Sequence, residues 1–180
     1  MTVTSGGDQT QVNAFTYNTV SPAGNLFVPG NSLDTPRYDT AVTLLSDGRI
    51  LVAGGFGNSG AMATTEIATA NNQVFGAGPS MGAARANHTA TLLGDGRVLV
   101  VGGTDGNTNL SSTELLNAAG TVFTAGPPLL GPRYSHTATL LADGRVLVAG
   151  GYGAAGPLAT AQVVDPLVNR GSGSIAMISP

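Results

Sequence analysis

The sequence contains no cysteine, no lysine and no tryptophan. Without cysteine the chain can form neither disulfides nor thiolate metal sites, and cysteine nucleophiles are excluded. Every basic residue other than the two histidines is arginine, the net charge is −3, and no basic cluster occurs. This composition argues against nucleic-acid binding. No apolar run approaches the roughly 18 residues of a membrane span, so none is expected.

Charged residues are also scarce, at 9% of the chain, against roughly 25% in typical soluble domains. Hydrophobic residues nevertheless make up 42% of the sequence, which argues against disorder. The chain has 27 glycines and 10 prolines but no collagen-like triplet, so these residues are expected to mark frequent turns.

One stretch occurs three times at a constant spacing of 48 residues. It reads RYDTAVTLLSDGRILVAGG from Arg37, RANHTATLLGDGRVLVVGG from Arg85 and RYSHTATLLADGRVLVAGG from Arg133. A repeat of this length indicates units that bury their apolar faces by stacking on their neighbours.

The middle copy predicts four short strands. His88–Leu93 and Val98–Val101 flank an Asp-Gly turn, and two apolar runs around such a turn predict a hairpin. A third strand is expected near Ser112–Asn117 and a fourth at Thr121–Ala125. The continuous run VLVV predicts a strand covered on both faces. Four antiparallel strands per unit, with no helical periodicity, are typical of a propeller blade.

The unit resembles the kelch repeat. The matching features are the opening Arg, the Asp-Gly-Arg hairpin, the strand that carries Glu66 or Glu114, and the glycine pairs at 54–55, 102–103 and 150–151. The family usually has a tryptophan on the fourth strand, where this chain has Phe75 and Phe123. The resemblance covers roughly residues 25–165 and implies an all-β, kelch-like β-propeller.

Residues 25–166 are therefore predicted to form about three four-stranded blades, half of a six-bladed ring. Asn25–Leu33 aligns with Gln73–Met81 and predicts a lone fourth strand, whereas the last unit is expected to stop after a third strand near Thr160–Asp165. Three blades are too few to close a ring of about four to eight. We expect a homodimer in which each N-terminal strand completes its partner's last blade. The alternative is that the missing blades belong to a longer parent sequence.

The flanking segments 1–24 and 167–180 are predicted to be separate. Thr2–Tyr17 is similar to the last two strands of an IPT/TIG immunoglobulin-like domain, and Ser174–Pro180 to the first strand of another. Ordinary strands with polar flanks are the alternative. The similarity implies a piece of a large bacterial surface or secreted protein. The N-terminus lacks the apolar core of a signal peptide, so a native start at Met1 would instead imply a cytoplasmic location.

Residues that recur in every unit are expected to be structural. The Arg that opens each unit is predicted to pair with the Glu of the third strand, and Gln162 in the last unit removes that charge. His88 and His136 stand where the first unit has Thr40. Each is expected to bond a neighbouring backbone group, and a metal site made from the two histidines is the alternative.

Loop residues that differ between the units are better functional candidates. In binding members of the kelch family the residue two after the repeat Arg faces the ligand, which implies roles for Asp39, Asn87 and Ser135. The loops around them add Phe56, Asp105, Asn107 and Tyr152. This set is polar, mildly acidic and partly aromatic, which suits a sugar or a peptide loop; a merely solvated face is the alternative.

Metal and cofactor chemistry is not predicted. Asp105, Asn107 and Asn109 begin like a calcium loop, but Leu110 stands where the glycine is required. Copper oxidases of the kelch class use a cysteine-linked tyrosine, which a chain without cysteine cannot form.

We therefore predict a non-catalytic binding or structural module for protein or carbohydrate ligands. The alternatives are a carbohydrate-active enzyme, either a sugar isomerase or an oxidase, and a self-assembling propeller fragment.

Overall fold

The computed structural model describes residues 31–70, 74–167 and 177–178. The chain divides into two units, residues 1–30 and 31–180, and every described residue belongs to the second. The N-terminal IPT/TIG-like segment and most of the predicted strand at Asn25–Leu33 lie outside the described residues. The same holds for the C-terminal IPT/TIG-like strand, apart from Met177 and Ile178.

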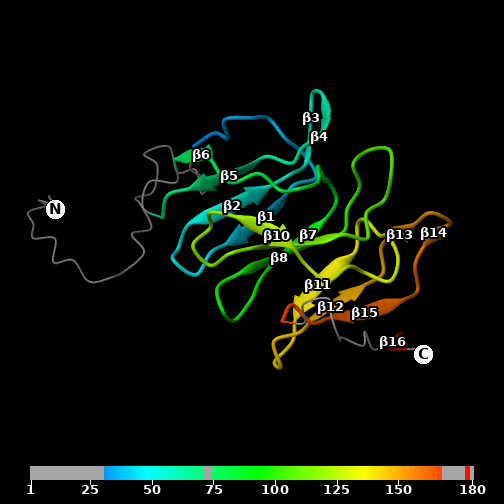
Figure 1. The fold of residues 1–180 in the computed structure, drawn as a ribbon. Coiled ribbons are helices and arrows are strands. Elements are labelled where there is room, and N and C mark those ends of the chain that lie inside the picture. Colours follow the sequence, from blue (N-terminus) through cyan, green and yellow to red (C-terminus); the bar gives the residue numbers. More distant parts are fainter. Residues whose placement is uncertain (1–30, 71–73, 168–176, 179–180) are drawn as a thin grey trace, which may run out of the picture. The chain divides into compact units, whose positions relative to one another are not determined.

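The described residues form strands and no helix, which confirms the predicted all-β fold. Three four-stranded antiparallel sheets follow one another along the chain (Figure 1). The first contains β1 (Ala41–Leu44), β2 (Ile50–Ala53), β5 (Thr65–Ala68) and β6 (Phe75–Ala77). The second contains β7 (Thr89–Leu92), β8 (Val98–Val101), β9 (Thr113–Leu116) and β10 (Phe123–Ala125). The third contains β11 (Thr137–Leu140), β12 (Val146–Ala149), β15 (Ala161–Val164) and β16 (Met177–Ile178).

A short hairpin follows the second strand of the outer two sheets. These hairpins are β3 (Phe56–Gly57) with β4 (Gly60–Ala61), and β13 (Tyr152–Gly153) with β14 (Gly156–Pro157). In the middle unit the equivalent loop closes through an isolated bridge between Thr104 and Asn109. All three loops leave the same end of their sheets, because each returns beside the residues that open its unit.

The Asp-Gly-Arg turns close the first hairpin of each unit. In the middle unit the Asp95 carboxylate accepts hydrogen bonds from the backbone N–H of Arg97, at 3.1 Å, and from its Nε, at 2.7 Å. Gly96 has φ +84°, a left-handed conformation that glycine adopts without steric cost. The other two turns have the same bonds.

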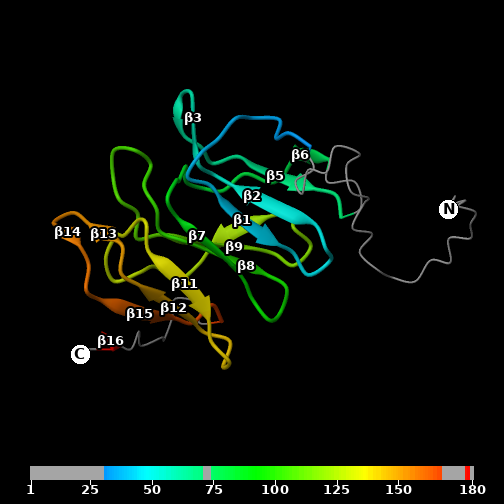
Figure 2. The ribbon, with the colours of Figure 1, turned by 180° about the vertical axis from the view of Figure 1, so that it is seen from behind.

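The core lies between the sheets. Val98, Val100 and Leu116 pack against Leu51 and Ala53 of the first sheet. The alternate residues of the second sheet pack toward the third, in a cluster of Leu99, Val101, Leu115, Val146, Val148 and Val164. The middle sheet is thus covered on both faces, as its continuous apolar strand predicts. The view from behind (Figure 2) shows the same succession, with β7 between β1 and β11.

The third sheet differs from the sequence-based expectation, which ended it at its third strand. Met177–Ile178 pairs antiparallel with β15, opposite Gln162 and Ala161. A segment from well beyond the repeat therefore forms the edge strand of the third sheet. In the other two sheets this edge is formed by β6, which contains Phe75, and β10, which contains Phe123.

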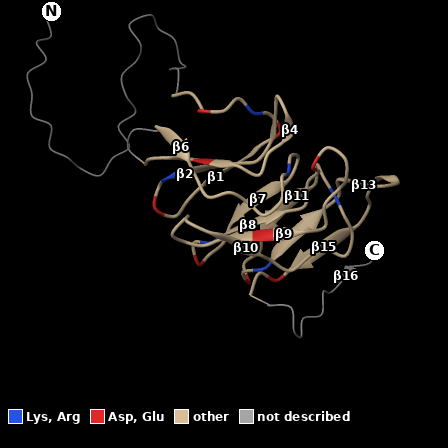
Figure 3. Ribbon diagram, turned by 45° about the horizontal axis from the view of Figure 1, so that its top comes forward, with Lys and Arg blue, Asp and Glu red and all other residues tan. Residues whose placement is uncertain are grey.

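The arginines that open the units are buried in the way the repeat predicts. Arg85 donates to a Glu114 carboxylate oxygen at 2.7 Å and to the Gly102 and Ser112 carbonyls, and Arg37 pairs with Glu66 at 2.8 Å. Each glutamate also accepts backbone N–H bonds from the segment entering its unit. Figure 3 shows how few other charges the described sheets carry.

In the third unit the expected loss of charge is confirmed. Among the described residues no carboxylate pairs with Arg133, which bonds instead to the Gly150 and Thr160 carbonyls. Gln162 accepts the Leu130 N–H at 3.0 Å. Burial lowers the pKa of Arg133 below its usual value.

The expectation for the two histidines is wrong. His136 Nε2 lies 3.0 Å from the Thr89 hydroxyl of the preceding sheet rather than from a backbone group. Neither ring nitrogen of His88 has a hydrogen-bond partner within the described residues. His88 lacks this bond because the first unit has Ala41 at the position of Thr89, so no hydroxyl of the preceding sheet faces the His88 ring. Burial lowers the pKa of His88 to about 3 and that of His136 to about 4.

Candidate functional site

Asp39, Asn87 and Ser135 form a row across the loop end of the three sheets. The N–H of Asn87 donates to the Asp39 carbonyl at 2.9 Å, and the N–H of Ser135 donates to the Asn87 carbonyl at 2.8 Å. The side chains follow the same order: Asn87 Nδ2 lies 3.1 Å from Asp39 Oδ2, and the Ser135 hydroxyl 3.4 Å from Asn87 Oδ1. Backbone bonds therefore hold three polar side chains from three units side by side.

All three residues of the row have left-handed backbone conformations, with φ of 53°, 53° and 52°. Few non-glycine residues adopt this conformation, and aspartate and asparagine tolerate it best. It occurs at the same place in every unit, just before the first strand. The repeat thus gives this residue the same backbone conformation in each unit, at the loop end of the sheets. The type of side chain differs between the units, whereas the backbone conformation is constant.

Aromatic pairs flank the row in the outer units. Tyr38 precedes Asp39 and contacts Phe56, with ring centroids 5.4 Å apart. Tyr134 precedes Ser135 and stacks on Tyr152 at 5.5 Å. Tyr38 is 62% exposed and Tyr152 45%. Paired backbone bonds hold each tyrosine opposite its partner residue.

The middle unit has Ala86 and Thr104 at the positions of the aromatic pairs. Its loop lies close to the first pair, because a Cβ added at Gly106 would be 3.4 Å from the Phe56 ring. The site therefore has an aromatic pair at each end of the row and small side chains between them.

Asp105 stabilises its own loop. Its carboxylate accepts bonds from the N–H groups of Asn107 and Thr108 and from the Thr108 hydroxyl, at 2.7 to 2.9 Å. These bonds lower the pKa of this carboxyl below its usual value. Asn107 is exposed at the tip of the loop. Of the two residues, only Asn107 thus presents its side chain away from the loop's internal bonds.

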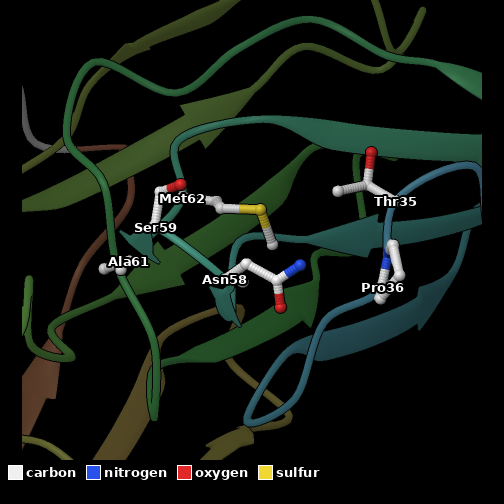
Figure 4. A pocket seen from close by; sticks show the side chains of 8 residues that line it. Thr35, Pro36, Asn58, Ser59, Ala61 and Met62 are labelled. Atoms are coloured by element: carbon white, nitrogen blue, oxygen red, sulfur yellow. The ribbon is translucent and has the colours of Figure 1, made fainter.

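A shallow pocket of about 230 Å³ lies beside the first hairpin (Figure 4). Its labelled lining residues are Thr35, Pro36, Asn58, Ser59, Ala61 and Met62. The Met62 side chain points from the hairpin toward the segment that enters the first unit. The pocket thus adds a concave surface at the loop end of the first unit, formed by residues outside the row of Asp39, Asn87 and Ser135.

The structure thus brings Asp39, Asn87 and Ser135 together and places Phe56 and Tyr152 beside them. Sequence reasoning missed Tyr38 and Tyr134, although both follow the repeat arginine directly and could have been found from the pattern Arg-Tyr. It also missed the pocket, because Thr35 and Asn58 are distant in sequence and carry no motif.

The described residues do not fit a metal centre. They contain no group of three or more His, Cys, Asp or Glu side chains placed to hold one ion. His88 and His136 lie between sheets, buried against the glycine pairs. In the part of the chain that the structure describes, no helix is long and apolar enough to cross a membrane.

No protein-family model matches the chain, and no curated protein does. Among solved structures it is similar to a fungal alcohol oxidase, described as having catalytic diversity among the AA5 family and solved in complex with copper. The two share a fold. The TM-score is 0.64 at 23% identity, over 72% of this chain. The chain spans 31% of the oxidase's length. At this identity the likeness concerns the fold alone, and the described residues contain no cluster of three or more His, Cys, Asp or Glu side chains that could hold copper.

Proposed function

We propose that the protein is a non-catalytic carbohydrate-binding module built from kelch-like propeller blades, part of a larger bacterial surface or secreted protein. The observation that carries the proposal is the row of Asp39, Asn87 and Ser135 between two partly exposed aromatic pairs. A rigid scaffold that presents variable loop residues at one end is a common arrangement for binding.

Sugars suit this arrangement for two reasons. An exposed tyrosine ring offers an apolar face with a polar hydroxyl at its edge, so Tyr38 and Tyr152 can stack on the C–H face of a sugar ring. The neighbouring carboxylate, amide and hydroxyl groups can bond the sugar hydroxyls. The side-chain bonds within the row hold these groups in place, which reduces the entropy lost on binding.

Catalysis is disfavoured because most carboxylates of the described sheets already pair with arginines. The buried glutamates are paired with arginine and backbone N–H groups, and the hairpin aspartates are paired with their own arginines. Asp39 is the carboxylate left at the row, and a sugar isomerase needs several charged groups that converge. Oxidation is the second candidate through the shared fold alone, since the described residues offer no cluster of metal-binding side chains. Formation of hydrogen peroxide by copper-treated protein on a panel of alcohols and sugars would establish it in place of binding.

A glycan array, followed by titration of a bound glycan, tests the binding proposal. N87G removes the amide but keeps a residue that tolerates φ +53°, and Y152A removes the exposed ring. Each should weaken binding about tenfold, since a lost hydrogen bond or stacking contact costs about 1 to 1.5 kcal/mol.

S135G and S46G form a matched pair, because glycine tolerates the φ of +52° at position 135. Ser135 lies in the row, whereas Ser46 is exposed in the hairpin turn at the other end of the first sheet. S135G should weaken glycan binding and S46G should not. Binding of no glycan, or equal loss in both variants, would refute the proposal. Capture of a protein loop that depends on Tyr152 would assign the site to a protein ligand instead.

A further inference from the structure

The first and third sheets each have one face that no described sheet covers. By repeat equivalence these two faces correspond to the two sides of the junctions between the first and second sheets and between the second and third sheets. In every sheet the residues opposite one another share a face. The second sheet uses one face against the first sheet and the other against the third. The outer sheets have the same two faces by repeat equivalence.

The uncovered face of the first sheet is apolar. Val42 is 62% exposed and Leu44 59%. Their equivalents in the second sheet, Ala90 and Leu92, pack against the core that joins it to the first sheet. Val42 and Leu44 lie opposite Val52 and Ile50 on this face, so the exposed apolar surface is contiguous, as is typical of interaction sites.

The uncovered face of the third sheet is the complement. Leu147 is partly exposed, whereas its equivalents Leu51 and Leu99 are fully buried in the two junctions. Thr137 and Thr139 on the same face are exposed. The Thr139 equivalent in the first sheet, Thr43, donates to the Ala90 carbonyl of the next sheet at 3.1 Å. By repeat equivalence Thr139 would meet Val42.

Polar contacts repeat at the internal junctions and lack a counterpart at the third sheet. Arg49 reaches the Ala119 carbonyl of the next sheet at 2.7 Å, and Arg97 reaches the Pro166 carbonyl at 3.4 Å. Their side chains are 28% and 26% exposed, against 45% for the equivalent Arg145. Among the described residues, Arg145 has no counterpart of the Ala119 and Pro166 carbonyls, which agrees with its greater exposure.

We propose that the uncovered face of the third sheet binds the uncovered face of the first sheet of a second copy of this chain. We name a second copy as the partner because repeat-equivalent faces already pack against each other at the two internal junctions. The same pairing of faces would be repeated between two chains. The row of backbone bonds would continue across the junction, from the Asp39 N–H of the second copy to the Ser135 carbonyl.

Two such junctions close a symmetric pair. A head-to-tail contact gives a ring when its rotation closes, and two copies of three sheets give six, within the range of about four to eight for closed propellers. Closure removes the exposed faces of both copies. The proposal is independent of what the loops bind, so loss of glycan binding leaves it standing.

Light scattering after size exclusion tests the pair with the full chain. The wild type should run at about twice the 17.8 kDa chain mass. V42D places a charge on the face of the first sheet, and T139R places one on the face of the third. Both should run as single chains. V122D is the matched control, because Val122 is 50% exposed but lies in a turn of the second sheet away from both faces.

Mixing distinguishes a broken face from a misfolded chain. V42D keeps a native third-sheet face and T139R a native first-sheet face, so the mixture should form a heterodimer through one native junction. A wild type that stays at the single-chain mass up to about 100 μM, a series of larger open assemblies, or a mixture that stays apart would overturn the proposal.

Discussion

Replacing Glu114 by glutamine should destabilise the protein by about 3 kcal/mol. Arg85 is fully buried, and Glu114 is its carboxylate partner at 2.7 Å. Glu114 also accepts the N–H groups of Gly82, at 2.6 Å, and Ala83, at 3.1 Å. Removing one partner of a buried ion pair typically costs about 3 to 5 kcal/mol. The lower figure applies because Arg85 keeps two carbonyl acceptors.

Urea unfolding followed by circular dichroism, at fixed protein concentration, measures the change. A loss of about 3 kcal/mol should also lower the melting temperature by roughly 6 to 12 °C for a chain of this size. D95N is the matched control. Its ion pair with Arg97 is also 2.7 Å long but lies on the surface, where such pairs contribute about 1 kcal/mol or less. If E114Q costs no more than D95N, the buried pair does not hold the sheet and the reasoning is wrong.

The third unit offers the converse test. Arg133 is buried without a carboxylate among the described residues, and Gln162 occupies the position of Glu114. Q162E should therefore raise the urea midpoint by pairing with Arg133. A fall in the midpoint would show that the carbonyl bonds of Arg133 already satisfy it.

Three further changes test the junctions between sheets. Buried His88 has a folded-state pKa near 3 against about 6.5 when unfolded, so the unfolded chain binds the extra proton and stability falls as pH drops below 6.5. At pH 5 the loss from His88 is about 2 kcal/mol. Buried His136, whose pKa is lowered to about 4, adds a loss of similar size. H88T should therefore reduce the slope of the unfolding free energy between pH 7 and 5 to about half. T89V removes the bond to His136 Nε2 and should cost about 1 to 3 kcal/mol by leaving that nitrogen unpaired; no loss in urea unfolding would contradict this. G103A should cost more than about 2 kcal/mol, since its Cβ would lie 2.6 Å from the Ala86 carbonyl oxygen at φ +96°, whereas G94A meets nothing within 4 Å and should be neutral in the same assay.

The sequence by itself determined the sheets. The 48-residue period, the Asp-Gly turns and the apolar run at Val98–Val101 predict strands that the structure places with small shifts at their ends. These features are local, since strand alternation and turn chemistry depend on neighbouring residues. The Arg85–Glu114 pair was also predictable, because both residues recur with the unit.

Tertiary structure decided what happens between sheets. The His136–Thr89 bond depends on residues brought together by the stacking of sheets, and so does the lack of a partner for the His88 ring among the described residues. The pairing of β16 with β15 within the third sheet depends on a segment that returns from beyond the repeat. The polar row is the clearest case. Sequence comparison selected Asp39, Asn87 and Ser135 as equivalent positions, but their hydrogen bonds to one another exist only because consecutive sheets pack face to face. A period in sequence defines equivalent positions, whereas contact between them requires the geometry of packing.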